Sequence, residues 1–173
     1  MAIWKSEGEW RYEYFSIDQS EEAIFSSGFE SIIRLWRLKS KTLPPRWADF
    51  EFMDFREWWG WLSVYDSIDG QSFEFDVRLW GTKVVETTGH ELTGKRLSLE
   101  TLPEISDPTG VSSNSIKFAR YNFDEGVIGI TSEPFRADWG PNTRYNEILL
   151  PLSSDGTTND KILFAGKITG PKI

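Results

Sequence analysis

Few side chains in this chain have the chemistry of a catalyst. Its 173 residues include one histidine and no cysteine, which excludes disulfides, thiolate catalysis, cysteine-ligated metals and a flavin–cysteinyl adduct. The histidine, His90, follows Gly89 and precedes Glu91 in a predicted turn. A surface or capping role explains it more simply than haem ligation or a catalytic triad. We therefore predict no catalytic residue, no metal site and no cofactor, and we expect that the protein is not an enzyme.

Two other groups of residues could be interpreted as a metal site and as a phosphate-binding loop, but both have simpler interpretations. Four carboxylates surround a predicted turn: Asp66, Asp69, Glu74 and Asp76. They lack the spacing of a calcium-binding loop, so a solvated sheet edge explains them. Three glycines follow: Gly81, Gly89 and Gly94. Their spacing is not that of a phosphate-binding loop, so we expect them at helix ends and turns.

Tryptophan is the residue type hardest to explain. Trp58, Trp59 and Trp61 fall within four residues around Gly60, which is more than one buried face can take. They either pack the leading part of the chain onto the domain or form an aromatic binding or dimer surface.

The charge balance restricts the partners. Nineteen basic against 27 acidic residues give a net charge of −8, which opposes binding to nucleic-acid phosphates and to anionic lipid. No stretch approaches the roughly 18 apolar residues of a membrane span, and the charged N-terminal residues do not form a secretory signal. We predict no nucleic-acid partner and no membrane association. The absence of cysteine does not fix the compartment alone, but a reducing cytoplasm fits it most easily, so we expect a cytoplasmic location.

Hydrophobic spacing predicts the elements that would position any site. Apolar residues recur at helical spacing at Phe25, Phe29, Ile32, Ile33 and Trp36. They predict an amphipathic helix that starts near residue 21, or only after Gly28, whose place inside a helix costs about 1 kcal/mol. Residues 1–17 alternate aromatic and charged side chains, as in an edge strand or a draped extension. A second helix is predicted over 111–121, and strands over 62–67, 72–80, 126–132, 144–152 and 161–168.

Three motifs resemble the Per-ARNT-Sim (PAS) family, in particular its bacterial stand-alone members. They are "LWRLKSKTLPPRWADF" at 35–50, "FEFDVRLWGTKVVETTGHELTGKRL" at 73–97 and "EILLPLSSDG" at 147–156. The resemblance covers about residues 30–168. It implies an α+β fold, with a PAS-like five-stranded antiparallel sheet, helices on one face and a leading N-terminal helix. The chain would then divide into an N-terminal extension (1–20), the leading helix (21–42) and the PAS-like domain (43–170).

The same resemblance implies a function. PAS domains usually bind a small ligand between helices and sheet, or pair with themselves or with signalling partners. We therefore expect a non-catalytic sensory or regulatory module that binds an unidentified small molecule or a signalling protein partner. The residues that would line its pocket are equally the expected core residues: Phe73, Phe75, Val77, Leu79, Phe118 and Tyr121.

The alternative is a ligand-free structural or interaction module. It would act through homodimerisation or docking, with the leading helix and the tryptophan-rich segment as its surface. The tryptophan load favours this alternative, because it leaves little room for a ligand. The interface candidates are Phe25, Phe29, Ile32, Trp36, Trp58 and Trp59.

Overall fold

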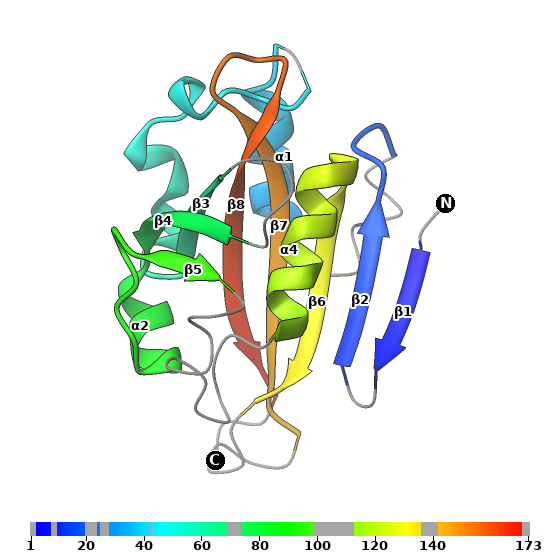
Figure 1. The fold of residues 1–173 in the computed structure, drawn as a ribbon, viewed down its shortest axis with the longest axis vertical. Helices are drawn as coiled ribbons and strands as arrows, with labels where there is room; N and C mark the ends of the chain where they lie inside the picture. Colours follow the sequence, from blue (N-terminus) through cyan, green and yellow to red (C-terminus); the bar gives the residue numbers. More distant parts are fainter. Residues whose placement is uncertain are drawn as a thin grey trace.

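An antiparallel sheet organises the molecule (Figure 1). The structure is a computed structural model, and it describes residues 3–7, 10–19, 24, 28–41, 43–68, 74–98, 113–135 and 142–170. Eight strands lie in the order β1-β2-β6-β7-β8-β3-β4-β5. The strands are β1 (Ile3–Glu7), β2 (Trp10–Phe15), β3 (Leu62–Ser67), β4 (Glu74–Trp80), β5 (Arg96–Ser98), β6 (Ile128–Pro134), β7 (Arg144–Ser153) and β8 (Asn159–Thr169).

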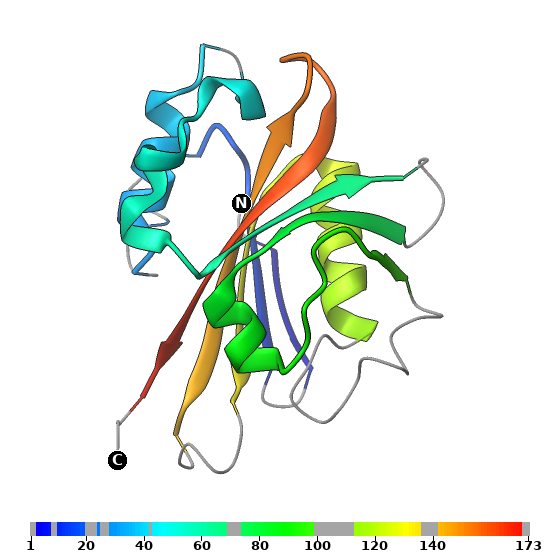
Figure 2. The same ribbon diagram turned by 90° about the vertical axis from the view of Figure 1, so that its left-hand side faces the viewer.

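Helices cover both faces of this sheet, as Figure 2 shows. They are α1 (Glu30–Leu38), α2 (Thr82–Thr88) and α4 (Ser113–Glu125), with the 3-10 helices η2 (Trp47–Asp49) and η3 (Phe52–Trp58). The helices α2 and α4 pack on one face, while α1 and η3 pack on the other. None of the described helices is long and apolar enough to cross a membrane.

The central strands need cover on both sides because they are apolar on both sides. In β7, Leu149 faces the α4 side, whereas its neighbours Ile148 and Leu150 face the α1 side. All three are fully buried. The sequence of a strand buried on both faces is a continuous run of apolar residues rather than an alternation of apolar and polar residues. The segment "ILLPL" is such a run.

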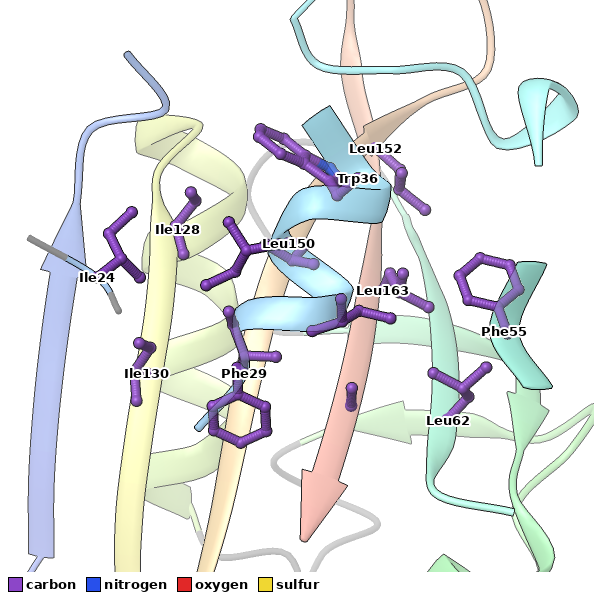
Figure 3. Close-up of a cluster of buried hydrophobic side chains, with 14 of the residues drawn as sticks. Ile24, Phe29, Trp36, Phe55, Leu62, Ile128, Ile130, Leu150, Leu152 and Leu163 are labelled. Atoms are coloured by element: carbon purple, nitrogen blue, oxygen red, sulfur yellow. The ribbon is translucent and has the colours of Figure 1, made fainter. Parts of the chain in front are cut away.

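Helix α1 is held on its face of the sheet by one apolar stripe. Ile32, Ile33 and Trp36 have no exposed surface, and Figure 3 shows Trp36 next to Leu152 above the strands. The Trp36 indole Nε1 donates a hydrogen bond to the Pro151 carbonyl oxygen at 2.7 Å. The helix begins just after Gly28, which has a φ of 75°, so the shorter of the two predicted helices is the observed one.

The five-stranded fold expected from the PAS resemblance is wrong. The sheet has eight strands, because residues 3–7 and 10–15 add β1 and β2 next to β6, and β5 extends the other edge. Helices lie on both faces, and α1 follows two strands instead of leading the chain. The alternation noted over residues 1–17 is therefore that of strands at Ile3–Glu7 and Trp10–Phe15, and the apolar central strands require a second helical layer.

Most of the individual elements lie where the hydrophobic spacing predicts them. Strand β3 has the predicted bounds, and β6, β7 and β8 differ from prediction by one or two residues at their ends. Strand β4 covers the described part of the predicted 72–80 segment. Helix α4 covers the described part of the predicted 111–121 segment and continues four residues beyond its predicted end.

A β-bulge changes which side chains of β4 face the core. The pairing of β3 with β4 shifts between Val64 and Tyr65, which leaves an extra residue on β4. Such an extra residue reverses the alternation beyond it. As a result Leu79, expected to face inward, is 38% exposed, and Trp80 is buried instead.

Candidate functional site

A cavity lies between the sheet and the helices α2 and α4. It contains about 40 Å³ in which the centre of a water-sized sphere fits, against the roughly 10–15 Å³ needed for one water. With the space open to solvent at its mouth, its empty volume is about 610 Å³. The cavity can therefore hold a few waters or a ligand of a few non-hydrogen atoms without rearrangement, and it can be reached from outside.

Two glutamates on adjacent strands line this cavity. Glu133 lies on β6 directly opposite Tyr145 of β7, and Glu147 lies on β7 opposite Thr131 of β6. The two glutamates are thus diagonal neighbours on one face of the sheet. In antiparallel pairs, diagonal neighbours lie about 7–8 Å apart, or somewhat less between Cβ atoms, so both carboxylates can reach one bound group.

Tyr145 holds Glu147 in place. Its hydroxyl donates a hydrogen bond to Glu147 Oε1 at 2.8 Å. The Tyr145 ring lies over Gly166 of β8, where a Cβ atom would collide with the hydroxyl. Glycine at position 166 therefore leaves the space that the tyrosine needs to reach the carboxylate.

Burial disfavours the charged forms of both glutamates. It raises the pKa of Glu147 to about 7, against a smaller lowering by the Tyr145 hydrogen bond. Burial also raises the pKa of Glu133 well above its usual value, the nearby Glu147 adds to this, and Arg144 opposes it. Both side chains keep partial solvent exposure, because they border the cavity while protein atoms surround the rest. A carboxyl group with a pKa near 7 can gain or lose a proton at neutral pH.

The remaining walls are largely aromatic. Tyr65 stacks on Trp80 with ring centroids 6.1 Å apart, and its ring centroid lies 4.2 Å from that of Phe164. Burial, followed by the charge of Glu147, raises the pKa of Tyr65, which places this ring in the field of the carboxylate. The other aromatic wall residues are Phe118, Phe135 and Tyr145.

Trp80 lines the cavity, but its indole nitrogen does not open onto it. The residue is 5% exposed, and its Nε1 is buried without accessible surface and without a hydrogen-bond partner in the structure. Buried indole N–H groups usually find an acceptor, so this donor is left unsatisfied in the core.

The segment 81–94 forms another part of the cavity wall. Val84, Thr87 and Thr88 of α2 line the cavity, and Gly89 ends the helix in a left-handed conformation. This agrees with the expectation that the glycines mark helix ends. His90 is half-buried beyond the helix, and its backbone N–H donates to Thr88 Oγ1 at 3.4 Å.

The predicted pocket residues have different positions. Phe118 lines the cavity. Phe75 and Val77 are buried in the same core cluster without lining it. Tyr121 is half-buried against Tyr14, with ring centroids 4.4 Å apart. Leu79 points away from this face, and Phe73 lies outside the described residues.

The predicted interface residues of α1 are covered by the protein's own sheet. Phe29, Ile32 and Trp36 have no exposed surface, so a dimer through them would require α1 to leave the sheet. Trp58 stacks on Phe29 at 5.6 Å, and Trp59 is 42% exposed. Phe25 lies outside the described residues.

The carboxylates considered first in the sequence have basic partners. Asp66 accepts hydrogen bonds from Lys161 Nζ at 2.7 Å and from Arg78. Glu74 and Asp76 both pair with Arg96. Within the described residues, no group of three histidine or acidic side chains could hold a metal ion. Asp69 lies outside that part of the chain.

Sequence reasoning missed Glu133, Tyr145 and Glu147. One signal could have found two of them. In the predicted strand 144–152, Tyr145 and Glu147 share the alternation of Leu149, so they point toward the same face as a core residue. A charged residue at an inward position of a strand is a reason to look for a site.

Comparisons with known proteins add no relative. The chain matches no protein-family model, no curated protein and no solved structure. The resemblance to the PAS family therefore remains a prediction from its sequence motifs.

Proposed function

We propose that this protein is a sensory or regulatory protein that binds a small molecule in the cavity beside Glu147 and does not transform it. The observation that carries the proposal is the cavity itself, which combines aromatic walls with a few convergent polar groups. This combination is typical of ligand sites. The cysteine-free composition fits the reducing cytoplasm, where we place the protein.

The cavity also offers a way to transmit binding. Its walls come from the strands, from α2 and from α4, so a ligand contacts elements that pack independently on the sheet. A ligand shifts a conformational equilibrium only through different contacts in the two states. We propose that the position of α2 or α4 differs between the free and bound protein.

Native mass spectrometry of the natively purified protein, with an absorbance scan, tests the binding proposal. We expect a mass excess that is lost on denaturation. In Ala119→Leu, a larger side chain replaces a buried residue of the cavity wall, so the excess should fall. Ala48→Leu makes the same change at an exposed position and should keep it. A bare mass, together with no binding in a fragment screen by NMR, would contradict the proposal.

A second candidate function is docking or self-association through an exposed apolar surface. Phe52, Met53 and Trp59 are 73%, 59% and 42% exposed, and Phe52 stacks on Trp59 at 4.8 Å. Exposed clusters of large apolar side chains commonly mark interaction sites. Sedimentation analysis should then show a dimer that dissociates in Phe52→Ser, and a monomeric wild type would contradict self-association.

A further inference from the structure

Where the structure describes the chain, no basic side chain lines the cavity beside its two carboxylates. Among the described residues that line it, none is a lysine, an arginine or a histidine. Arg144, which influences Glu133, has its guanidinium on the other face of the strands, where it donates to Ser132 Oγ at 2.7 Å and to the Ser132 carbonyl oxygen at 2.8 Å. Partly buried carboxylates without a facing cation are costly, and a bound cation would supply the missing charge.

The aromatic walls favour an organic cation over a metal ion. Within the described part of the chain, no cluster has the ligands for a metal. Electron-rich rings attract ammonium groups that lie within about 6 Å of the ring centroid. Tyr145 lines the cavity and donates a hydrogen bond to Glu147, and the charge of Glu147 acts on Tyr65 in the same wall. An ammonium group there can therefore contact a carboxylate and an aromatic ring together.

The two glutamates also restrict the rest of the ligand. An additional carboxylate on it is disfavoured, because the two glutamates would repel it.

We propose that the cavity is specific for a small organic ammonium ion that carries no carboxylate. The ammonium group binds between Glu133 and Glu147. The size of the free space limits an unrearranged ligand to a few non-hydrogen atoms. This inference rests on the proposed ligand-binding function and names the class of its ligand.

Calorimetric titration with ethanolammonium and with ethylene glycol tests the inference. The two probes have the same number of non-hydrogen atoms and differ in the charge of one end. We expect saturable binding of ethanolammonium and none of ethylene glycol. Glu147→Gln should weaken ethanolammonium binding at least tenfold, because it removes the charge while keeping the side-chain shape. Glu57→Gln, which makes the same change at an exposed residue of η3, should leave binding unchanged.

The Trp80 indole signal in a ¹H–¹⁵N NMR spectrum locates the binding. It should move on addition of ethanolammonium in the wild type and in Glu57→Gln. Denaturation with urea shows whether the Glu147→Gln protein is folded. If it is not folded, Glu133→Gln is used to test the charge preference instead.

Three results would overturn the inference. Equal binding of the two probes would remove the charge preference. If the binding of both probes were then lost in Ala119→Leu, the proposal that the cavity binds small ligands would survive, and only the preference for a cation would fail. Ethanolammonium binding that is unchanged in Glu147→Gln and in Glu133→Gln would place the cation elsewhere. The absence of ethanolammonium binding would exclude this ligand class, while native mass spectrometry decides separately whether the cavity holds any ligand.

Discussion

Glu147 shows how burial gives an ordinary carboxyl group unusual properties. Its hydrogen bond from Tyr145 favours the ionised form, but burial is the larger effect and raises the pKa to about 7. Glu133 lies nearby with a pKa raised in the same direction. Two interacting carboxyl groups titrate as a pair, so the cavity holds less negative charge at neutral pH than its two glutamates suggest.

The stability of the protein should therefore depend on Glu147 in a defined pH range. The folded pKa lies above the usual 4.5, so between these values the folded state binds more protons than the unfolded state, and stability falls as pH rises. Glu147→Gln should stabilise the protein above pH 7, by at most roughly 3 kcal/mol because the carboxylate is partly exposed. The gain should disappear below the usual pKa.

Urea denaturation at a mildly alkaline and at an acidic pH measures this difference. Glu57→Gln serves as the control, because Glu57 is exposed. A Glu147→Gln protein that is no more stable than the wild type at alkaline pH would show that Glu147 is well solvated.

At the scale of elements, contacts between strands and helices position the cavity residues. Gly166 on β8 makes room for Tyr145 on β7, and Tyr145 holds Glu147. The two-sided burial of the central strands places α1 on one face and α4 on the other. Strands and helices could be predicted from hydrophobic spacing, but the bulge that turns Trp80 inward could not. It depends on pairing between β3 and β4 rather than on either sequence alone.

Gly166→Ala should destabilise the protein by about 1–3 kcal/mol, because the new Cβ collides with the Tyr145 hydroxyl. In a Tyr145→Phe background the loss should be smaller, since the nearest clashing atom is gone. Unfolding free energies of the two single variants and the double variant give the coupling between the residues. Strictly additive effects would mean that the two side chains do not meet as the structure places them.

Trp36→Phe should cost about 1–3 kcal/mol, because it removes the hydrogen bond to Pro151 and leaves unfilled space under α1. Trp59→Phe, at a residue 42% exposed, removes only a solvent-exposed hydrogen bond to the Phe52 carbonyl oxygen and should change the free energy of unfolding by less than about 1 kcal/mol. Equal losses in the two variants would contradict the docking of α1 through Trp36.

The whole molecule is a sheet with two unlike sides. One side is covered by α1 and η3 over a cluster of buried apolar side chains (Figure 3). The other side, under α2 and α4, contains the cavity with its glutamates. The two faces thus differ in how they are packed, and this difference was not predictable from the sequence. The apolar residues of 25–36 could have packed on either face, and the number of strands depended on whether residues 1–17 joined the sheet.

The central claim is that the cavity contains a desolvated carboxylate that can bind a cation. The most direct test is to measure the pKa of Glu147 by following its side-chain carboxyl ¹³C chemical shift as a function of pH. We predict a midpoint at about 7 in the free protein, and a lower midpoint with ethanolammonium bound, because a nearby cation favours the charged form. A midpoint near the usual 4.5 that does not move with ethanolammonium would contradict both the site and its ligand.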